Sequence, residues 1–297
     1  MMNLKQQTLT ELLSRQATKE GFHESAIRDL VLFKASDQRA RLQTLCEAFI
    51  VVLGQGNVCC YVGGEMYDFS VGSYLTLFLP MSLEIEVLAA SAEAPLLAAC
   101  IRVDLSRIAT LLLQMDGVGE ALGEKETAVS SGIFTAPINH KLLDPTIRLL
   151  EALDDPRDIT ILSQAIIDEI YYRVLCDDRP GASSFRHLLE QRGQIQKIAR
   201  AVNHIQNHLD EKVSVEYLAR LVNMSTSSFH RSFKAVMHVS PVKYAQAMKL
   251  FRAQTLLKEG YTVSEAGYQV GYNSPAQFSR EYKRHFGYAP SATVAVG

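Results

Sequence analysis

The sequence predicts an α+β chain, with an N-terminal β-barrel and flanking helices followed by an all-α C-terminal domain of two helix-turn-helix units joined by a long helix. Short segments rich in Val, Ile, Tyr and Phe, separated by turn signals, fill residues 45–103, as in small barrels. Beyond residue 193 the apolar residues recur at helical spacing. There, Ser227–Pro241 and Ala276–Pro290 share one pattern at an offset of 49 residues, which indicates a structural unit used twice.

Composition limits the class of protein. The chain has 297 residues, 47% of them hydrophobic, which is enough for two domains with cores of their own. No apolar run approaches the ~20 residues that span a bilayer, and the polar-interrupted N-terminus differs from a secretory signal. The five cysteines are odd in number and include no C-x-x-C, which favours reduced thiols. We therefore expect a cytoplasmic protein.

The net charge of −2 conceals an asymmetry between the two parts of the chain. From Gly193 onward there are 13 Lys and Arg against 6 Asp and Glu, a net charge of +7, so the remainder carries −9. A basic C-terminal third on an acidic body predicts that the C-terminal part meets a polyanion. A solvated basic surface without a partner would have the same charge, and the repeat decides between the two interpretations.

In the N-terminal half, leucines at helical spacing predict one or two helices over residues 1–30. Six short antiparallel strands are expected over residues 45–103, and Gly63-Gly64 supplies a hairpin turn that needs positive φ. Five of these strands are predicted over Val58–Val62, Glu65–Phe69, Tyr74–Leu79, Leu83–Leu88 and Leu96–Val103.

Helices are expected after the strands. Asp104 is predicted to cap a helix that ends near Met115, and a polar loop covers about residues 117–137. Amphipathic helices are predicted over Leu142–Leu153 and Thr160–Leu175. A polar breaker then begins at Asp177, and we place the domain boundary near it.

The C-terminal part is predicted to be wholly helical. One long helix begins at Ser240-Pro241 and stops at Gly260, the expected preference for Pro at the start and Gly past the end. Ser or Thr caps mark most of the other helix starts. The predicted helices are Gln194–Leu209, Ser214–Leu221, Ser225 to about Val236, Pro241–Lys258, a short one from Thr262, and the last from Ser274-Pro275 to Phe286.

Each repeated helix has an apolar and a polar face. In the second copy Phe278, Tyr282 and Phe286 share one face, and the first copy has apolar residues at matching places. The other face carries hydrogen-bond donors in both copies, and a major groove about 12 Å wide admits such a helix. Small residues, Ala219 and Gly267, are expected where the two helices of each unit cross. Exposure to water alone could explain any one of these polar residues. It explains less well a set of donors at matching places in two units.

The segment Ser264–Tyr272, followed by Phe278–Pro290, resembles the signature of AraC/XylS transcription regulators. The resemblance covers about residues 194–293 and implies two helix-turn-helix units joined by one long helix, here Pro241–Lys258. Its 18 residues would span about 27 Å, a spacer suited to two recognition helices in successive major grooves about 34 Å apart. The family usually has Ile-Ala where this chain has Ala266-Gly267, and Gly costs a helix about 1 kcal/mol relative to Ala.

The resemblance also implies which residues meet double-stranded promoter DNA. The contacts to bases are assigned to Ser227, Ser228, His230, Arg231, Ala276, Gln277 and Arg280. The contacts to phosphates are assigned to Lys234, Arg252, Ser274, Lys283 and Arg284. The second copy ends in the basic run Lys283-Arg284-His285, so we expect it to be richer in phosphate contacts and the first copy to read bases more finely.

The N-terminal half resembles, more weakly, the cupin-like β-barrel domain of a subgroup of the same family. Cupin enzymes hold a metal with histidines and a carboxylate, but the histidines before residue 187 are His23 and His140, both outside the predicted strands. No metal site or cofactor is therefore expected. The adjacent Cys59 and Cys60 alternate on a strand, so one thiol points inward, where it would meet an effector or oxidant. The simpler interpretation, which the frequent burial of free cysteines favours, is that the two are ordinary small hydrophobic residues.

The domains then follow: residues 1–180 for effector binding and dimerisation, with the barrel at about 45–103 and helices at 104–176, a linker at 181–193, and a DNA-binding domain at 194–297 with units at about 214–236 and 262–286. We expect a DNA-binding transcription regulator, an activator controlled by a small and fairly hydrophobic effector. Its expected partners are a second copy of the chain and, for an activator, RNA polymerase. A constitutive DNA binder whose barrel only dimerises is the alternative. An enzyme with a helical appendage is disfavoured, since no cofactor loop or paired acid and base motif occurs.

Overall fold

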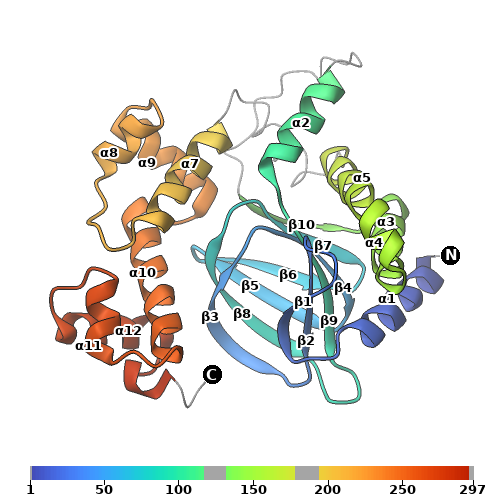
Figure 1. The fold of residues 1–297 in the computed structure, drawn as a ribbon, viewed down its shortest axis with the longest axis horizontal. Helices are drawn as coiled ribbons and strands as arrows, with labels where there is room; N and C mark the ends of the chain where they lie inside the picture. The colour runs from blue at the N-terminus through green and yellow to red at the C-terminus, as the bar shows by residue number, and fades with distance from the viewer. Residues whose placement is uncertain (1, 117–131, 178–193, 294–297) are drawn as a thin grey trace.

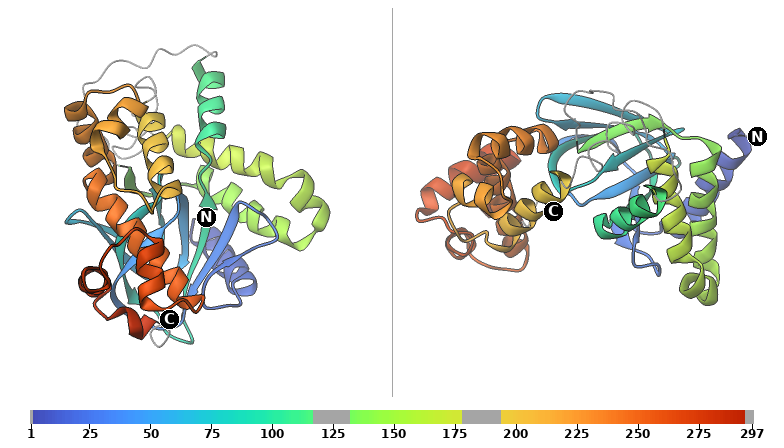
Figure 2. Two further views of the ribbon diagram at one scale, coloured as in Figure 1. Left: turned by 60° about the vertical axis from the view of Figure 1, so that its left-hand side comes forward. Right: turned by 90° about the horizontal axis from the view of Figure 1, so that it is seen from above.

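The computed structural model describes residues 2–116, 132–177 and 194–293, and Figure 1 shows their arrangement. The N-terminal β-rich domain lies between a layer of helices on one side and the C-terminal helical domain on the other (Figures 1 and 2). The predicted linker at 181–193 and most of the predicted loop at 117–137 lie outside the described residues. Among the described residues, no helix is both long enough and apolar enough to cross a membrane.

Ten strands form two antiparallel sheets that face each other as an open barrel. One sheet has the order β1-β2-β9-β4-β7-β10 and the other β3-β8-β5-β6. Inward side chains from both sheets make one apolar core. The strands are β1 (Gly21–Glu24), β2 (Leu30–Ala35), β3 (Arg39–Cys46), β4 (Phe49–Gln55), β5 (Asn57–Val62), β6 (Glu65–Ser70), β7 (Ser73–Leu77), β8 (Met81–Ala89), β9 (Leu96–Arg102) and β10 (Ile133–Pro137).

The strands predicted between residues 45 and 103 are confirmed, as is the hairpin turn, in which Gly63 and Gly64 have φ of +61° and +94°. The predicted range of the barrel is too short, because β1 to β3 precede it and β10 follows it. The helical prediction for residues 21–30 is wrong. Gly21 has φ +77°, and the side chains of β1 alternate between half-buried and exposed, which is a strand pattern.

Helices cover the outer side of the larger sheet (Figure 1). The predicted cap Asp104 is confirmed, since its Oδ1 accepts hydrogen bonds from the N–H groups of Ser106 and Arg107 at 2.8 and 3.2 Å. The predicted helix over 160–175 is interrupted at Leu162. The helices of this domain are α1 (Met2–Gln16), α2 (Leu105–Asp116), α3 (His140–Glu151), α4 (Pro156–Ile161) and α5 (Ser163–Leu175), with a 3-10 turn at Ala152–Asp154.

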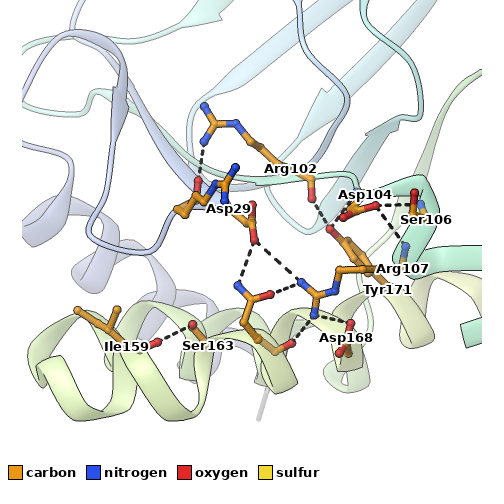
Figure 3. Close-up of polar contacts among 11 residues, drawn as sticks. Asp29, Arg102, Asp104, Ser106, Arg107, Ile159, Ser163, Asp168 and Tyr171 are labelled. Atoms are coloured by element: carbon orange, nitrogen blue, oxygen red, sulfur yellow. Dashed lines mark hydrogen bonds and ion pairs between the residues drawn. The ribbon is translucent and has the colours of Figure 1, made fainter. Parts of the chain in front are cut away.

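A polar network ties α2 and α5 to the ends of the strands (Figure 3). The guanidinium of Arg107 on α2 donates to Asp168 on α5 at 2.6 Å and lies 4.0 Å from Asp29. The hydroxyl of Tyr171 donates to the carbonyl of Arg102 at 2.5 Å and accepts from the N–H of Asp104 at 3.1 Å. Helices α2 and α5 are therefore joined to each other by an ion pair, and hydrogen bonds of Tyr171 join α5 to the end of β9 and the start of α2.

The C-terminal domain is helical throughout its described residues, and the predicted caps Ser214, Ser225, Ser240, Thr262 and Ser274 each accept a hydrogen bond from a first-turn N–H. Helices α7 to α9 form the first unit and α11 with α12 the second, joined by α10. Their bounds are α7 (Gln194–Asn207), α8 (Val215–Leu221), α9 (Thr226–Met237), α10 (Pro241–Lys258), α11 (Val263–Gln269) and α12 (Pro275–Phe286).

Candidate nucleic-acid interface and effector cavity

In the first unit, α8 and α9 form the helix-turn-helix, and α7 precedes them. Phe229, Phe233 and Val236 on α9 are fully buried, as the repeat predicts, and Ala219 on α8 is buried where the two helices meet. Ser225 caps α9 by accepting from the N–H of Ser228 at 3.3 Å. The buried aromatic side chains thus fix α9 so that its other face remains exposed.

The second unit consists of α11 and α12 and repeats this plan. Phe278 and Tyr282 are fully buried and Phe286 nearly so. A methyl group added at Gly267 would lie 3.1 Å from the ring of Phe278, so the predicted close approach of α11 and α12 is confirmed. A capping box at Thr262 and Glu265 fixes the start of α11.

The side chains predicted to contact DNA lie mostly on the exposed faces of α9 and α12. Ser228 and Ser274 are half-buried, and the other residues of both predicted sets are exposed. Five of the six predicted cations form no ion pair among the described residues. These five are Arg231 and Lys234 on α9 and Arg280, Lys283 and Arg284 on α12.

Two predicted contacts have carboxylate partners inside the protein. Arg252 lies 3.9 Å from Glu259 on α10. The amide of Gln277 donates to Glu281 at 3.1 Å. Burial opposes ionisation of Glu281, but this bond and those from Gln246 and Tyr272 outweigh it and lower the pKa of the carboxyl. The bond to Glu281 uses one N–H of the Gln277 amide and leaves its second N–H and its carbonyl oxygen for a contact to DNA.

The predicted basic run at the end of α12 is only partly basic. His285 turns inward, with its ring edge-on to Phe251 and Phe286 at centroid distances of 5.3 and 4.7 Å. Burial and, to a smaller extent, the charge of Arg284 lower the pKa of His285 to about 4, so the ring is neutral near pH 7. Its assignment to a basic surface is wrong, because the i, i+7 spacing from Phe278 brings it to the edge of the apolar face.

The two units contact each other directly as well as through α10. Gly271, which follows α11, has φ +81°, and a methyl group there would lie 2.2 Å from the carbonyl oxygen of Asp210, which follows α7. Burial lowers the pKa of Lys249 on α10, while the nearby carboxylate of Asp210 opposes that shift. The spacing of the two recognition helices is therefore set by this contact in addition to the long helix.

A dry cavity of about 60 Å³ lies inside the open barrel. Every residue that lines it is apolar or a cysteine, and aromatic side chains from β1, β2, β4 and β6 form much of its wall. An apolar cavity excludes water and accepts apolar molecules. The lining residues of the strands that matter below are Val58, Cys60, Leu75, Leu77, Leu83 and Ile85.

The cysteine pair on β5 divides as alternation predicts. Cys60 lines the cavity, whereas Cys59 lies on the other face, beside Asp68 and Glu86. Burial raises the pKa of Cys60 to about 12 and also raises the pKa of Cys59, so both are neutral thiols near pH 7. Cys46 and Cys100 line the same cavity. No sequence signal indicated that these two cysteines, 54 positions apart, would meet Cys60.

No cluster of three or more His, Cys, Asp or Glu residues among the described ranges is placed to hold a metal ion. His204 and His208 stack on α7 with ring centroids 4.1 Å apart. Nδ1 of His208 lies 2.9 Å from the carbonyl of His204, and burial lowers the pKa of His204. The pair lines a depression between α7 and α8.

Both halves of the chain match models of known protein families. A family model for the N-terminus of AraC-type transcriptional regulators matches residues 26–182, and one for a helix-turn-helix domain matches residues 218–295. The lactose operon transcription activator of Staphylococcus xylosus is 32% identical over 90 residues, 30% of this chain and 32% of that protein. The transcriptional regulator GbdR of Pseudomonas aeruginosa is 30% identical over 131 residues, 43% of this chain and 35% of the relative. The matches thus span about a third of each relative's length.

Solved structures with the same fold cover nearly the whole chain. ToxT of Vibrio cholerae O395 aligns over 93% of this chain and 98% of its own, with a TM-score of 0.55 and 12% identity. Vibrio cholerae ToxT with a bound unsaturated fatty acid aligns over 90% of this chain and 93% of its own, with a TM-score of 0.52 and 10% identity. At this level of identity the likeness establishes the fold.

Proposed function

Because the chain belongs to the family of AraC-type transcriptional regulators, we propose that it binds promoter DNA with both recognition helices under the control of a small effector in the barrel cavity. The observation that carries the proposal is the pair of equivalent helices, α9 and α12. Each is anchored by buried aromatic side chains, and α9 presents two and α12 three exposed cations without an ion pair among the described residues. Such a helix can donate to base edges while the cations meet phosphates.

The cavity supports an apolar effector. Its lining offers sulfhydryl groups as the one polar chemistry, and these are neutral, so an uncharged apolar molecule fits better than an anion. A ToxT structure contains an unsaturated fatty acid, which supports ligand binding in this fold. An acyl chain fits the apolar lining of the present cavity, but its carboxylate would need a partner that the lining does not supply.

We further propose that the regulator acts in the cytoplasm as a homodimer that activates transcription, with RNA polymerase as its partner at the promoter. The lactose operon relative is an activator, which supports this direction. Helices α4 and α5 expose Ile161, Leu162 and Tyr172 on the side of the barrel away from the DNA-binding domain. That surface is where we expect the second copy to bind.

A salt-titrated binding experiment tests the proposed function. The full chain is titrated with a randomised duplex pool and with the promoter region next to its own gene. The logarithm of the association constant for specific binding should fall linearly with the logarithm of the salt concentration, with a slope of about −0.9 per phosphate neutralised. Equal affinity for all duplexes would contradict sequence-specific recognition. Specific binding that no apolar ligand alters would instead favour the constitutive DNA binder.

A further inference from the structure

The barrel contacts the C-terminal end of the first recognition helix. The N–H of Gly132, just before β10, donates to the carbonyl of Val236 in the last turn of α9 at 2.9 Å. The hairpin turn between β5 and β6 reaches the residue after α9, since a methyl group at Gly63 would lie 2.6 Å from Cβ of His238. Carbonyls in the last turn of a helix lack partners within the helix, so Gly132 satisfies one of them from another domain.

Both contacts depend on glycine. A methyl group at Gly132 would lie 2.6 Å from the carbonyl oxygen of Val236 and 2.7 Å from the terminal carbon of Met81. At Gly63 it would lie 2.8 Å from the carbonyl oxygen of His238 as well. Real Cβ atoms do not approach other atoms this closely, so a larger residue at either position forces the barrel or the end of α9 to shift.

The end of α9 also departs from the repeat. His238 has the left-handed φ of +58°, and the corresponding residue after α12 is Gly287 with φ +83°. Glycine adopts this conformation freely, whereas other residues do so at a cost of roughly 1–2 kcal/mol. The first copy thus carries a side chain where the second has none, and that side chain is the one in contact with the barrel.

Each contact point continues into a strand that lines the cavity or that pairs with a strand lining it. Gly63 directly follows β5, whose Val58 and Cys60 line the cavity, and Gly132 directly precedes β10. Ile133 on β10 pairs with Leu77 of β7, another lining residue. A third point joins Tyr244 of α10, whose hydroxyl donates at 3.1 Å to the carbonyl of Pro80, to the start of β8.

The second unit is related to the barrel differently. Between α10 and α12 on one side and β3 and β8 on the other lies a groove of about 530 Å³. Its walls are largely polar and include Tyr61, Glu84, Glu281 and Arg284. The helical layer of α3 to α5 lies on the opposite side of the barrel from both units (Figures 1 and 2). The hydrogen bonds from the barrel strands that are described above therefore lead to the end of α9 and to α10.

We propose that the effector cavity controls DNA binding through the first unit, by changing how firmly the barrel holds the C-terminal end of α9 at Gly63 and Gly132. This inference rests on the proposed function and specifies its regulation. An occupied cavity moves strands β5, β7 and β8, and their ends carry the contacts to α9 and α10. A ligand shifts the arrangement only if it binds the held and released forms with different affinities.

Hydrogen exchange on the full chain, without DNA, tests the contact. Gly63→Ala and Gly132→Ala are compared with Gly64→Ala, a matched control in the same hairpin turn. Gly64 also has positive φ, but nothing lies within 4 Å of a methyl group added there. We expect the amides of α9 to exchange at least about tenfold faster in the two test variants, with α12 unchanged and the control like the wild type. Equal exchange of α9 in all four proteins would overturn the proposal.

Xenon, which enters dry apolar cavities, tests the connection to the cavity. Filling the cavity in the wild type and in Gly64→Ala should change the exchange of α9 amides, and in Gly132→Ala the change should disappear although xenon still binds. A change at α9 that persists in Gly132→Ala, or no change in the wild type with the cavity filled, refutes the connection. Failure of the wild type to bind DNA would contradict the proposed function, while these exchange measurements would still decide the inference.

Discussion

Arg231 and Arg280 occupy equivalent positions on the two recognition helices, and both are exposed without an ion pair among the described residues. We predict that Arg280→Ala weakens specific binding by about 1–3 kcal/mol and relaxes the base preference at one position, because a bidentate contact to a base edge is lost. Gel-shift titrations over a randomised operator measure both effects. Lys283→Ala is the matched control, and it should weaken binding to all sequences alike. An unchanged preference in Arg280→Ala would defeat the assignment.

His285 predicts a pH dependence of stability. Its pKa falls to about 4 in the folded chain, against about 6.5 unfolded, so protons bind more readily to the unfolded state. The contribution of neutral His285 to the free energy of unfolding is complete above pH 6.5. It is lost as the pH falls toward 4, by up to about 3 kcal/mol. Denaturant unfolding at a series of pH values measures the loss. His285→Phe, which suits the aromatic surroundings, should flatten this part of the profile, and an equally steep profile would exclude His285 as its source.

At the scale of elements, α9 and α12 differ more than the repeat indicates. The second helix ends in two exposed cations and a half-buried neutral histidine, whereas α9 ends against the barrel. The expectation that the second copy is richer in phosphate contacts therefore rests on Lys283 and Arg284 alone. Of these, Arg284 also lines the groove that faces the barrel.

We predict that the first helix carries most of the sequence discrimination. Alanine scans of the exposed faces of α9 and α12, each measured against specific and random DNA, compare the two. Substitutions on α9 should reduce the ratio of specific to random affinity more than those on α12. A larger loss of discrimination from α12 would reverse the assigned roles.

The contact between the two units predicts that Gly271→Ala is destabilising. Alanine disfavours φ of +81°, and its methyl group would meet the carbonyl of Asp210 at 2.2 Å. The two effects together should cost at least about 2 kcal/mol of unfolding free energy and weaken binding to operators with correctly spaced half-sites. Gly260→Ala is the control, because Gly260 has φ +96° but open space around it. Similar losses in both variants would show that backbone strain alone is responsible.

At the scale of the whole molecule, the barrel separates the proposed dimer surface from the DNA-binding domain (Figure 1). We predict that Ile161→Asp lowers the dimer fraction measured by light scattering, because the side chain of Ile161 is 72% exposed on the outer helices and a charge would oppose its burial against a second copy. Tyr268→Asp, an exposed apolar side chain on α11, serves as the control. A wild-type chain that is monomeric with and without DNA would contradict the prediction.

Local chemistry made most of the C-terminal domain predictable. Caps such as Ser225 and Thr262, the Pro241 start and the aromatic spacing at Phe278 act within a few residues, so helix ends and buried faces followed from the sequence. The hairpin at Gly63-Gly64 followed for the same reason. The helical prediction for residues 21–30 failed because β1, a strand of four residues, has little periodicity of its own. Its pairing with β2 decides its conformation.

The sequence by itself determined the two domains, the repeated units and the exposed donors on each recognition helix, because those features depend on short-range spacing. Only the tertiary structure decided that His285 is half-buried and neutral, that three cysteines surround one cavity, and that Gly132 bonds to the end of α9. These depend on contacts between residues far apart in the chain, here more than 100 positions for Gly132 and Val236. Periodicity carries no information about such contacts, since packing between separate elements creates them.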